Sequence, residues 1–343
     1  MKRSFTTTLQ FLAIPGLAFG VATMMAALLL WLNGYAVLPA LVALVHGAFG
    51  STYAMAETVV RTVPLLITGL AVAFAFRAGV WNIGAEGQLL IGALTAIAVA
   101  PMLAALPPYL RFLLMLLCSA SAGGLWASLA GWMKLQRQVP EVVSTILLNF
   151  IALELVRYAV NGPFMEAAQQ FPQTDALAPE LRLTRWLPPT RLHAGVWFAP
   201  VLALLVHLLI RRTIFGFNLR ATAANAIAAR FAALHVARIQ IWSMAISGAL
   251  AGFAGAMELS GVTYRLYQNF SPGYGYTAIA VALMARLQPL AIIGTAFLFG
   301  ALENGALAMQ RQASVSAVIV NMMQGLVVLT IAVAGALELR RKD

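Results

Sequence analysis

The sequence predicts an all-α fold, a polytopic integral membrane bundle of about ten transmembrane helices. Of the 343 residues, 62% are hydrophobic and only 10% are charged, whereas a soluble domain carries about 25% charged residues. The apolar residues also gather in runs of roughly 20, the length that crosses a bilayer. Polar side chains are too few to cover a soluble core, and the single Cys118 allows no disulfide within the chain. A soluble domain, a disordered chain and a disulfide scaffold are therefore excluded.

Charged residues, prolines and polar clusters mark the ends of the apolar runs. The first run is too long for the core of a signal peptide, so we interpret it as an uncleaved span. Residues 36–50 are apolar but short, which favours an interfacial or re-entrant segment. The eighth span is short enough to predict a half-helix packed inside the protein. The ten spans are expected near residues 11–32, 57–76, 88–106, 109–132, 142–162, 195–210, 239–260, 276–287, 289–310 and 315–337.

The distribution of Lys and Arg predicts that both termini lie in the cytoplasm. Residues 163–194 then lie outside, and their prolines predict an ordered but non-helical cap. Residues 211–238 lie inside and are rich in Ala and Arg, which predicts helix. In this arrangement fourteen of the 22 basic residues are cytoplasmic: Lys2, Arg3, Arg77, Lys134, Arg137, Arg211, Arg212, Arg220, Arg230, Arg238, Arg286, Arg340, Arg341 and Lys342.

Two short segments recur in the sequence. Residues 67–69 (Ile-Thr-Gly) resemble residues 246–248 (Ile-Ser-Gly), and residues 95–100 resemble residues 277–282. The paired spans run in opposite directions, which is typical of an inverted repeat with the solute pathway at its interface. Coincidence among Ala, Ile and Val is the alternative. Separately, glycines at 248 and 252 have the spacing of closely packed membrane helices.

Residues 77–88 contain the most informative polar run. Three glycines within nine residues weaken a helix by roughly 1 kcal/mol each relative to Ala. Asn82, Glu86 and Gln88 are polar, and a charge in mid-membrane costs on the order of 3 kcal/mol, so Glu86 should face protein or water. The run predicts either a broken helix that lines or hinges a pathway, or an ordinary loop at the inner surface.

Other polar residues fall at membrane depth. Asn149 suits a neutral hydrogen-bonding solute or a bond between helices. Glu258 lies near the outer end of its span, where it can face a vestibule. Glu303 is either a pathway residue or a buried brace beside Asn304. Two pairs of oppositely charged residues have helical spacing and are predicted to be local ion pairs: Glu57 with Arg61, and Glu154 with Arg157.

The sequence lacks the residue patterns of an enzyme. The four histidines are isolated, so neither a metal site nor a catalytic residue is expected. None of the lysines, Lys2, Lys134 and Lys342, follows a glycine as a Walker A loop requires. A separate subunit must therefore supply any ATP hydrolysis. The net charge of +11 is scattered between apolar runs, so no nucleic-acid partner is expected.

Five segments in order carry a family resemblance that covers residues 10–338. Residues 82–88 (Asn-Ile-Gly-Ala-Glu-Gly-Gln) look like the signature of permease subunits of ABC importers in the branched-chain amino acid, ribose and nucleoside superfamily. Within that superfamily the sequence resembles the nucleoside (simple sugar) type. The other four segments are residues 139–152, residues 216–221 followed by Asn225, Ala228 and Ala229, residues 246–252, and residues 273–276 followed by residues 279–283.

The resemblance implies a single permease domain, 1–343, in the bacterial cytoplasmic membrane. It would move a small polar solute, a nucleoside, by alternating access. The partners implied are an ABC ATPase, a second permease or a second copy, and an extracytoplasmic solute-binding lipoprotein. The chain itself would bind no cofactor, since ATP and Mg belong to the ATPase. The pathway residues expected are Asn82, Glu86, Gln88, Asn149, Glu258 and Glu303. Those expected in the cytoplasmic coupling loop are Gly216, Arg220, Asn225, Ala228, Ala229 and Arg230.

The coupling loop also has a pattern of its own. Basic residues alternate with Ile227, Phe231 and Leu234 at helical spacing, which predicts one short amphipathic helix. Such a helix either lies on anionic lipid or docks into a groove of a cytoplasmic partner. The family usually has glycines where this chain has Ala223 and Ala233. Alanine favours helix more strongly than glycine, so the bend of the loop in this chain is expected to differ from that of the family. Reversing the charge of Arg220 is expected to abolish transport without unfolding the chain.

Two rival functions remain at this point. An ion-coupled secondary transporter would use Glu86 and Glu303 as its relay, and it would work without ATP. A permease of the same superfamily could instead carry a pentose, riboflavin or another ring compound.

Overall fold

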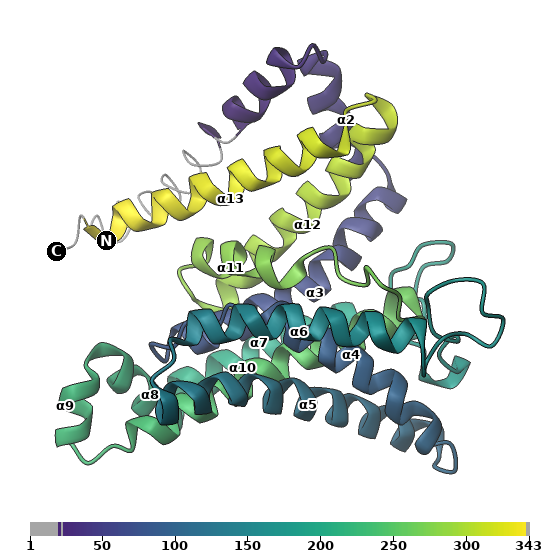
Figure 1. Cartoon of the computed structure of the whole chain (residues 1–343). Helices are drawn as coiled ribbons and strands as arrows, with labels where there is room; N and C mark the ends of the chain where they lie inside the picture. Colours follow the sequence, from purple (N-terminus) through teal and green to yellow (C-terminus); the bar gives the residue numbers. More distant parts are fainter. Residues whose placement is uncertain (1–19, 22, 341–343) are drawn as a thin grey trace.

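The chain forms a bundle of helices (Figure 1). The computed structural model describes residues 20–21 and 23–340, apart from the side chains of 327–328 and 331–340. Within these residues every regular secondary-structure element is a helix, and β structure is limited to two isolated bridges. The all-α prediction is confirmed for this part of the chain.

Seven of the described helices are long and apolar enough to cross a membrane. Each coincides with an expected span, with ends that differ by a few residues. The chain is therefore a multi-pass membrane protein. The seven are α3 (Thr52–Phe76), α4 (Ala85–Met102), α5 (Pro108–Arg137), α6 (Glu141–Asn161), α7 (Gly195–Arg212), α10 (Val236–Glu258), which continues into the π-helical turn η2 (Leu259–Thr263), and α12 (Pro289–Gln312).

Shorter helices complete the bundle. α2 (Val37–Phe49) and α11 (Tyr274–Met284) fall where short segments were predicted. The 11 residues of α11 span about 16 Å, roughly half the thickness of a bilayer core. Residues 11–19 and 22 of the first expected span lie outside the described residues, but Thr23–Leu32 is helical. α13 (Ala317–Arg340) occupies the last expected span.

Glycines let α10 pack closely against α4 and α5. A Cβ at Gly252 would overlap the carbonyl of Ser119, and a Cβ at Gly248 would overlap the carbonyl of Gly123. A Cβ at Gly255 of the same helix would overlap the carbonyl of Leu89 in α4. The close packing predicted from the spacing of Gly248 and Gly252 is confirmed. α3 is the most buried of the seven long helices and packs against α10, α11 and α12.

The two long loops lie at opposite ends of the bundle (Figure 1). Residues 163–194 contain only the 3-10 turn η1 (Pro179–Leu181), in line with their prolines. Backbone hydrogen bonds tie this loop to the chain that follows α10, from Thr174 to Leu266 (2.8 Å) and from Leu183 to Ser260 of η2 (2.8 Å). The loop is thus an ordered cap on that end.

The other loop, 211–238, differs from the sequence prediction. It forms two helices, α8 (Ile214–Ala224) and α9 (Ala226–Phe231), rather than one. Asn225 separates them with extended backbone, and its side chain accepts hydrogen bonds from the N–H groups of Ile227 and Ala228, both 3.0 Å. Asparagine competes with the helix in this way and is among the best N-caps. The prediction of a single helix was therefore wrong at Asn225.

Candidate functional site

The polar run between α3 and α4 is an irregular, buried segment. Asn82 and Gln88 hold each other through two amide hydrogen bonds of 3.0 and 2.9 Å. Asn82 also donates to the hydroxyl of Ser247 (2.8 Å), and that hydroxyl donates to the carbonyl of Ala71 in α3 (2.6 Å). The amide pair therefore ties the start of α4 to α10 and α3. Both amide side chains are buried and face neighbouring helices rather than open space.

Asn149 of α6 caps the first turn of α4. The N-cap residue of α4, Gly84, has no side chain to offer, so the first N–H groups of α4 need partners from elsewhere. Asn149 accepts from the N–H of Gly87 (2.8 Å) and donates to the carbonyl of Ile83 (3.0 Å). A Cβ at Gly87 would lie 2.9 Å from the Cα of Asn149. Gly87 is therefore required because it lets α4 and α6 approach each other closely at Asn149.

Glu86 lies where the N-termini of α4 and α11 meet. Its carboxylate accepts a hydrogen bond from the N–H of Gly275 (2.7 Å) in the first turn of α11. A Cβ at Gly275 would overlap the backbone nitrogen of Glu86, so the two helix starts are in direct contact. The positive ends of both helix dipoles lie beside the carboxylate and stabilise its charge. Helix N-termini that meet inside the membrane are typical of transporter binding sites.

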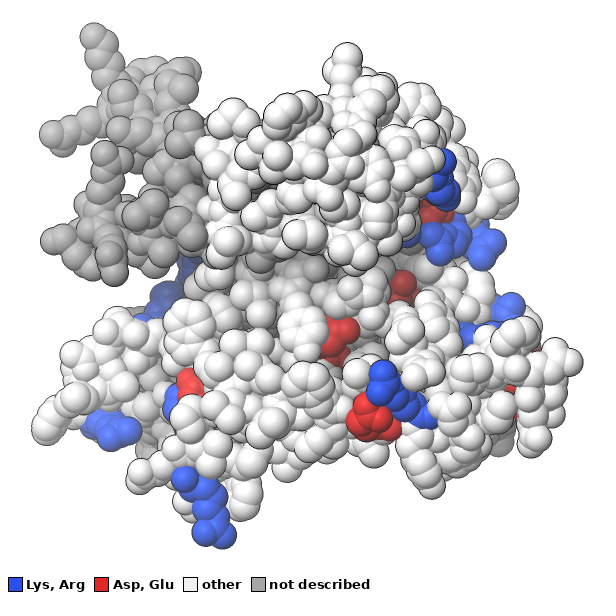
Figure 2. All heavy atoms as spheres, turned by 45° about the horizontal axis from the view of Figure 1, so that its top comes forward, with Lys and Arg blue, Asp and Glu red and all other residues white. Residues whose placement is uncertain are grey.

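This polar cluster opens toward the surface at Tyr276. The hydroxyl of Tyr276 accepts a hydrogen bond from the amide of Asn149 (3.3 Å), and the residue is 45% exposed. Figure 2 shows a recess across one face of the molecule with acidic side chains inside it. We therefore define the helix-start cluster as Asn82, Glu86, Gln88, Asn149 and Tyr276. The sequence prediction missed Tyr276, although it lies in one of the five resemblance segments.

Glu258 and Glu303, the other expected pathway residues, belong to a separate charged cluster. Arg191 of the cap donates to both carboxylate oxygens of Glu57, each at 3.1 Å. Arg61 lies 3.8 Å from the carboxylate of Glu303. The predicted local pair between Glu57 and Arg61 was therefore wrong, because each residue finds its partner on another segment. The hydrogen bonds and charge of Glu57 raise the pKa of the Arg191 guanidinium above its usual value.

Within the charged cluster, Glu258 is buried on α10, and Arg191 and Arg61 are the cations that act on it. Glu303 lies against Arg61. Its neighbour Asn304 donates to the carbonyls of Gly47 and Ala54, both 2.9 Å, and so ties α12 to the α2–α3 turn. Asn304 is a structural brace. The structure thus divides the six expected pathway residues between two clusters.

His193 is a buried cap residue for which no role was predicted from the sequence. Its Nδ1 accepts from the N–H of Gly195 (3.1 Å), and a Cβ at Gly261 would lie 2.6 Å from the ring. Burial, reinforced by the charges of Arg185 and Arg191, lowers the pKa of His193 to about 4. The ring is therefore neutral at physiological pH and packs the cap onto α10.

The expected coupling residues divide into buried and exposed groups. Gly216 and Ala229 are buried, and Arg220 donates to the carbonyl of Ile210 at the end of α7. A basic side chain that satisfies carbonyls there closes the helix, so Arg220 holds the loop together. Among the expected coupling residues, Asn225, Ala228 and Arg230 are exposed, and the apolar side chains of Ile227 and Phe231 beside them are exposed too.

Of the coupling helices α8 and α9, α8 contacts residues 77–84, the broken segment between α3 and α4 that leads to Glu86. Ala223 of α8 lies close to Gly79, where an added Cβ would be 3.4 Å from the Cα of Ala223. Gly79 has φ of 72°, which favours glycine. Arg77 in the same turn donates to the carbonyl of Leu287 after α11 (2.5 Å). Burial, together with the charges of Arg211 and Arg220, lowers the pKa of Arg77.

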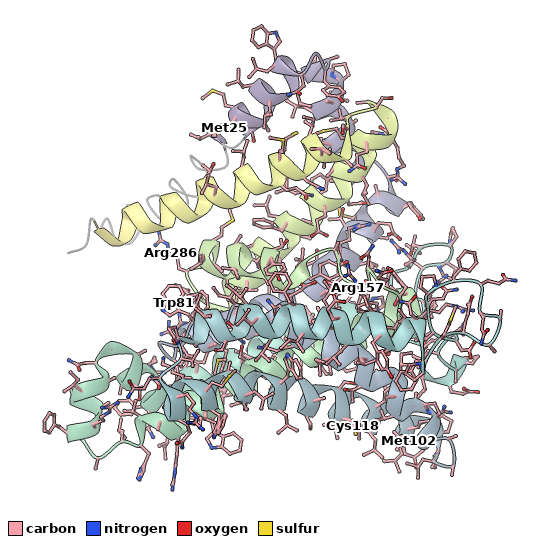
Figure 3. The ribbon with its side chains drawn as sticks, viewed as in Figure 1. Met25, Trp81, Met102, Cys118, Arg157 and Arg286 are labelled. Carbon is pink, nitrogen blue, oxygen red and sulfur yellow. The ribbon has the colours of Figure 1, made fainter. Side chains whose placement is uncertain are left out.

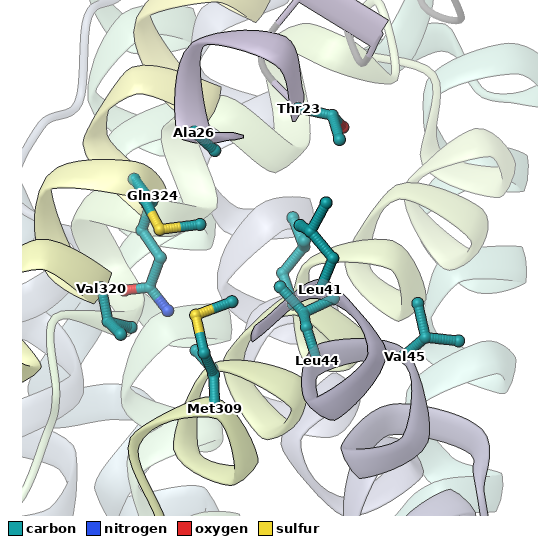
Figure 4. A pocket seen from close by; sticks show the side chains of 11 residues that line it. Thr23, Ala26, Leu41, Leu44, Val45, Met309, Val320 and Gln324 are labelled. Atoms are coloured by element: carbon teal, nitrogen blue, oxygen red, sulfur yellow. The ribbon is translucent and has the colours of Figure 1, made fainter. Parts of the chain in front are cut away.

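An apolar cavity of about 250 Å³ lies away from both clusters, between α2, α12, α13 and helix Thr23–Leu32. Leu, Val, Met and Ala side chains form most of its wall, and among the described residues Thr23 and Gln324 are the polar ones that line it (Figure 4). It offers little hydrogen bonding to a polar solute. We regard it as a packing gap between peripheral helices.

Comparison with known proteins identifies the family. A family model described as "Branched-chain amino acid transport system / permease component" matches residues 54–332. The chain belongs to this family. It is 35% identical over 334 residues to the guanosine ABC transporter permease protein NupP of Bacillus subtilis, covering 96% of this chain and 95% of NupP. It is therefore a transport subunit of ABC type, and the ion-coupled alternative is set aside.

Two further relatives show how solutes vary across the family. The chain is 32% identical over 293 residues to the glucose ABC transporter permease protein TsgB13 of Haloferax volcanii, covering 81% of this chain and 76% of TsgB13. It is 26% identical over 258 residues to NupQ, a second guanosine ABC transporter permease protein of Bacillus subtilis, covering 71% of this chain and 78% of NupQ.

Proposed function

We propose that this chain is the permease of a bacterial importer of nucleosides driven by ATP. The observation that carries the proposal is the meeting of α4 and α11 at Glu86, which is linked to the coupling helices through the contact of Ala223 with Gly79. The near full-length similarity to NupP supports a nucleoside as the solute. The similarity to TsgB13, a glucose permease, makes a sugar or another ring compound the second candidate for the solute.

The proposed architecture is about ten spans arranged as an inverted repeat. The packing pattern supports it, because α3 contacts α11 and α12 as α10 contacts α4 and α5. In the same way, α4 contacts α5 and α6 as α11 contacts α12 and α13. The repeat axis would pass where α3 and α10 pack against each other. Glu86, at the contact between α4 and α11, then lies at the repeat interface, where transporters place their solutes.

In the proposed mechanism, docking of α8 and α9 on an ATPase drives alternating access. The exposed Ile227 and Phe231 suit an apolar groove in the partner. Movement of α8 would pass through Gly79 to the broken segment and so to the start of α4. The solute itself does not react. The work comes from the different affinities of the ATPase for the two states, because a ligand with equal affinity for both shifts neither.

The remaining assignments follow from the same proposal. The chain would lie in the bacterial cytoplasmic membrane with both termini inside, so that α8 and α9 face the cytoplasm and residues 163–194 face outward. The ATPase would hold ATP and Mg, and this chain would hold no cofactor. A solute-binding lipoprotein would deliver the nucleoside to the cap. The pair of guanosine permeases in Bacillus subtilis supports a second permease as partner.

Uptake of radiolabelled guanosine tests the solute. The complex is reconstituted in proteoliposomes with ATP supplied to the ATPase, and unlabelled adenosine, ribose and glucose compete in turn. We expect uptake that requires ATP and is suppressed by adenosine. Suppression by ribose or glucose but not by adenosine would overturn the nucleoside assignment in favour of the sugar.

A further inference from the structure

One face of α6 points away from the rest of the chain and carries a charged pair. The salt bridge between Arg157 and Glu154 measures 2.7 Å, and the Glu154 side chain is 63% exposed. The exposed residues repeat at helical spacing, so they form one continuous face. We call it the open α6 face, and it consists of Val143, Leu147, Phe150, Ile151, Glu154 and Tyr158.

This charged pair does not suit contact with lipid. Glu154 lies seven residues before the end of α6 at Asn161, which places it about 10 Å inside the helix end. Arg157, which Figure 3 marks, is long enough to reach toward that end. The shorter carboxylate of Glu154 is not. Acidic groups at membrane depth almost always face protein or a water-filled cavity.

The outward face of α5 differs in composition from the open α6 face. α5 also has an outward face, formed by Leu113, Leu117, Leu125 and Leu129. Between Arg111 and Lys134 that helix has no charged residue at all. The α5 face therefore has the composition of a lipid contact, whereas the open α6 face does not. Exposure of the two faces is otherwise similar, at 53% for Leu117 and 58% for Phe150.

The open α6 face adjoins the helix-start cluster. Asn149, which caps α4, precedes Phe150 on the same turn of α6. The hydrogen bond from Asn149 to the half-exposed Tyr276 marks where the cluster reaches the surface. A solute that leaves the cluster at Tyr276 would therefore meet Phe150 first and Glu154 about one turn further along the helix.

We propose that the open α6 face lines the water-filled pathway and binds the nucleoside through Phe150, Glu154 and Tyr158. The aromatic rings can stack on the base, since every base presents a π face. The carboxylate of Glu154 can accept hydrogen bonds from ribose hydroxyls or base N–H groups, and Arg157 can donate them. This inference rests on the proposed function and names the residues through which the chain would bind its solute.

Cysteine labelling tests the proposal cleanly because Cys118 is the only cysteine. In a Cys118→Ser background, Phe150→Cys and the matched control Leu117→Cys are placed in the whole complex in lipid nanodiscs. A charged methanethiosulfonate reagent then measures access from water. We expect Phe150→Cys to react at least tenfold faster than Leu117→Cys, and guanosine to slow only the Phe150→Cys reaction.

Two results would overturn the inference. Equal, slow labelling of both cysteines would place the open α6 face in lipid. Slow labelling of Phe150→Cys combined with efficient cross-linking to the second permease would make the face a subunit contact. Guanosine uptake by the Cys118→Ser parent complex is measured first. Its absence counts against the proposed function, whereas uptake without labelling of Phe150→Cys counts against this inference alone.

Discussion

Replacing Asn149 by Leu should strongly destabilise the fold, because one side chain of α6 caps another helix. The substitution keeps the size of the side chain but removes both partners of the start of α4. The N–H of Gly87 and the carbonyl of Ile83 would then be buried without a hydrogen bond. Each such group costs about 1–3 kcal/mol, so the expected loss of unfolding free energy is about 2–6 kcal/mol.

Tyr276→Phe is the matched control. It removes only the 3.3 Å bond between Asn149 and the half-exposed hydroxyl, and its expected cost is at most about 1 kcal/mol. Both variants are unfolded by titration with SDS in mixed micelles and followed by tryptophan fluorescence. If Asn149→Leu costs no more than Tyr276→Phe, then Asn149 does not cap α4 and the reasoning about the helix-start cluster fails.

Three further predictions concern the cap and the coupling loop. The pKa of His193 is lowered to about 4 from its usual value of 6.5, so its contribution to stability is complete above pH 6.5 and is lost as the pH falls toward 4. Between pH 7.5 and 4 the unfolding free energy of the wild-type chain should therefore fall by about 3 kcal/mol through this residue. The same titration of His193→Gln should lack that fall. Ala233 has φ of 60°, a backbone conformation that glycine adopts at lower cost, so Ala233→Gly should strengthen amide protection around α9 by about 1 kcal/mol. Ala223→Gly, inside α8, should instead weaken amide protection by a similar amount. Hydrogen exchange measures both variants, and equal effects would contradict this reasoning. Phe231 is 90% exposed, so Phe231→Glu should leave the chain folded but unable to retain the ATPase in a pull-down, and retention at the wild-type level would disprove docking through α9.

The structure also changes what is expected of Arg220→Glu. From the sequence, this variant should stay folded and fail only in transport. Arg220, however, donates to the carbonyl of Ile210 at the end of α7. Replacing it by an acid removes that donor and puts a negative charge at the negative end of a helix. The variant should therefore also lower the yield of folded protein, so Phe231→Glu is the better probe of docking.

Much of the fold was predictable from hydropathy, because a bilayer fixes the length of apolar runs. The seven long helices and the short α11 lie where the sequence predicted them. The close packing of α10 also followed from its glycine spacing. The break at Asn225 was a local signal that the prediction overlooked, since asparagine is a strong N-cap.

The partners of the polar groups were not predictable in the same way. Glu57 and Arg61 have the spacing of a helical pair, but their actual partners are Arg191 and Glu303. Helical spacing says which residues share a face, and it says nothing about which other segment lies opposite. The same holds for Asn149, whose role as a cap depends on α4 beginning beside α6. Such contacts appear only once the helices are placed in space.

The most direct test of the central claim is to purify the tagged chain from its native membrane in mild detergent and identify its partners by mass spectrometry. We expect an ATPase with Walker motifs and a second permease to be recovered with it. Recovery of the chain alone, together with guanosine uptake by that single chain in liposomes without ATP, would show that the chain is not the permease of an ATP-driven importer.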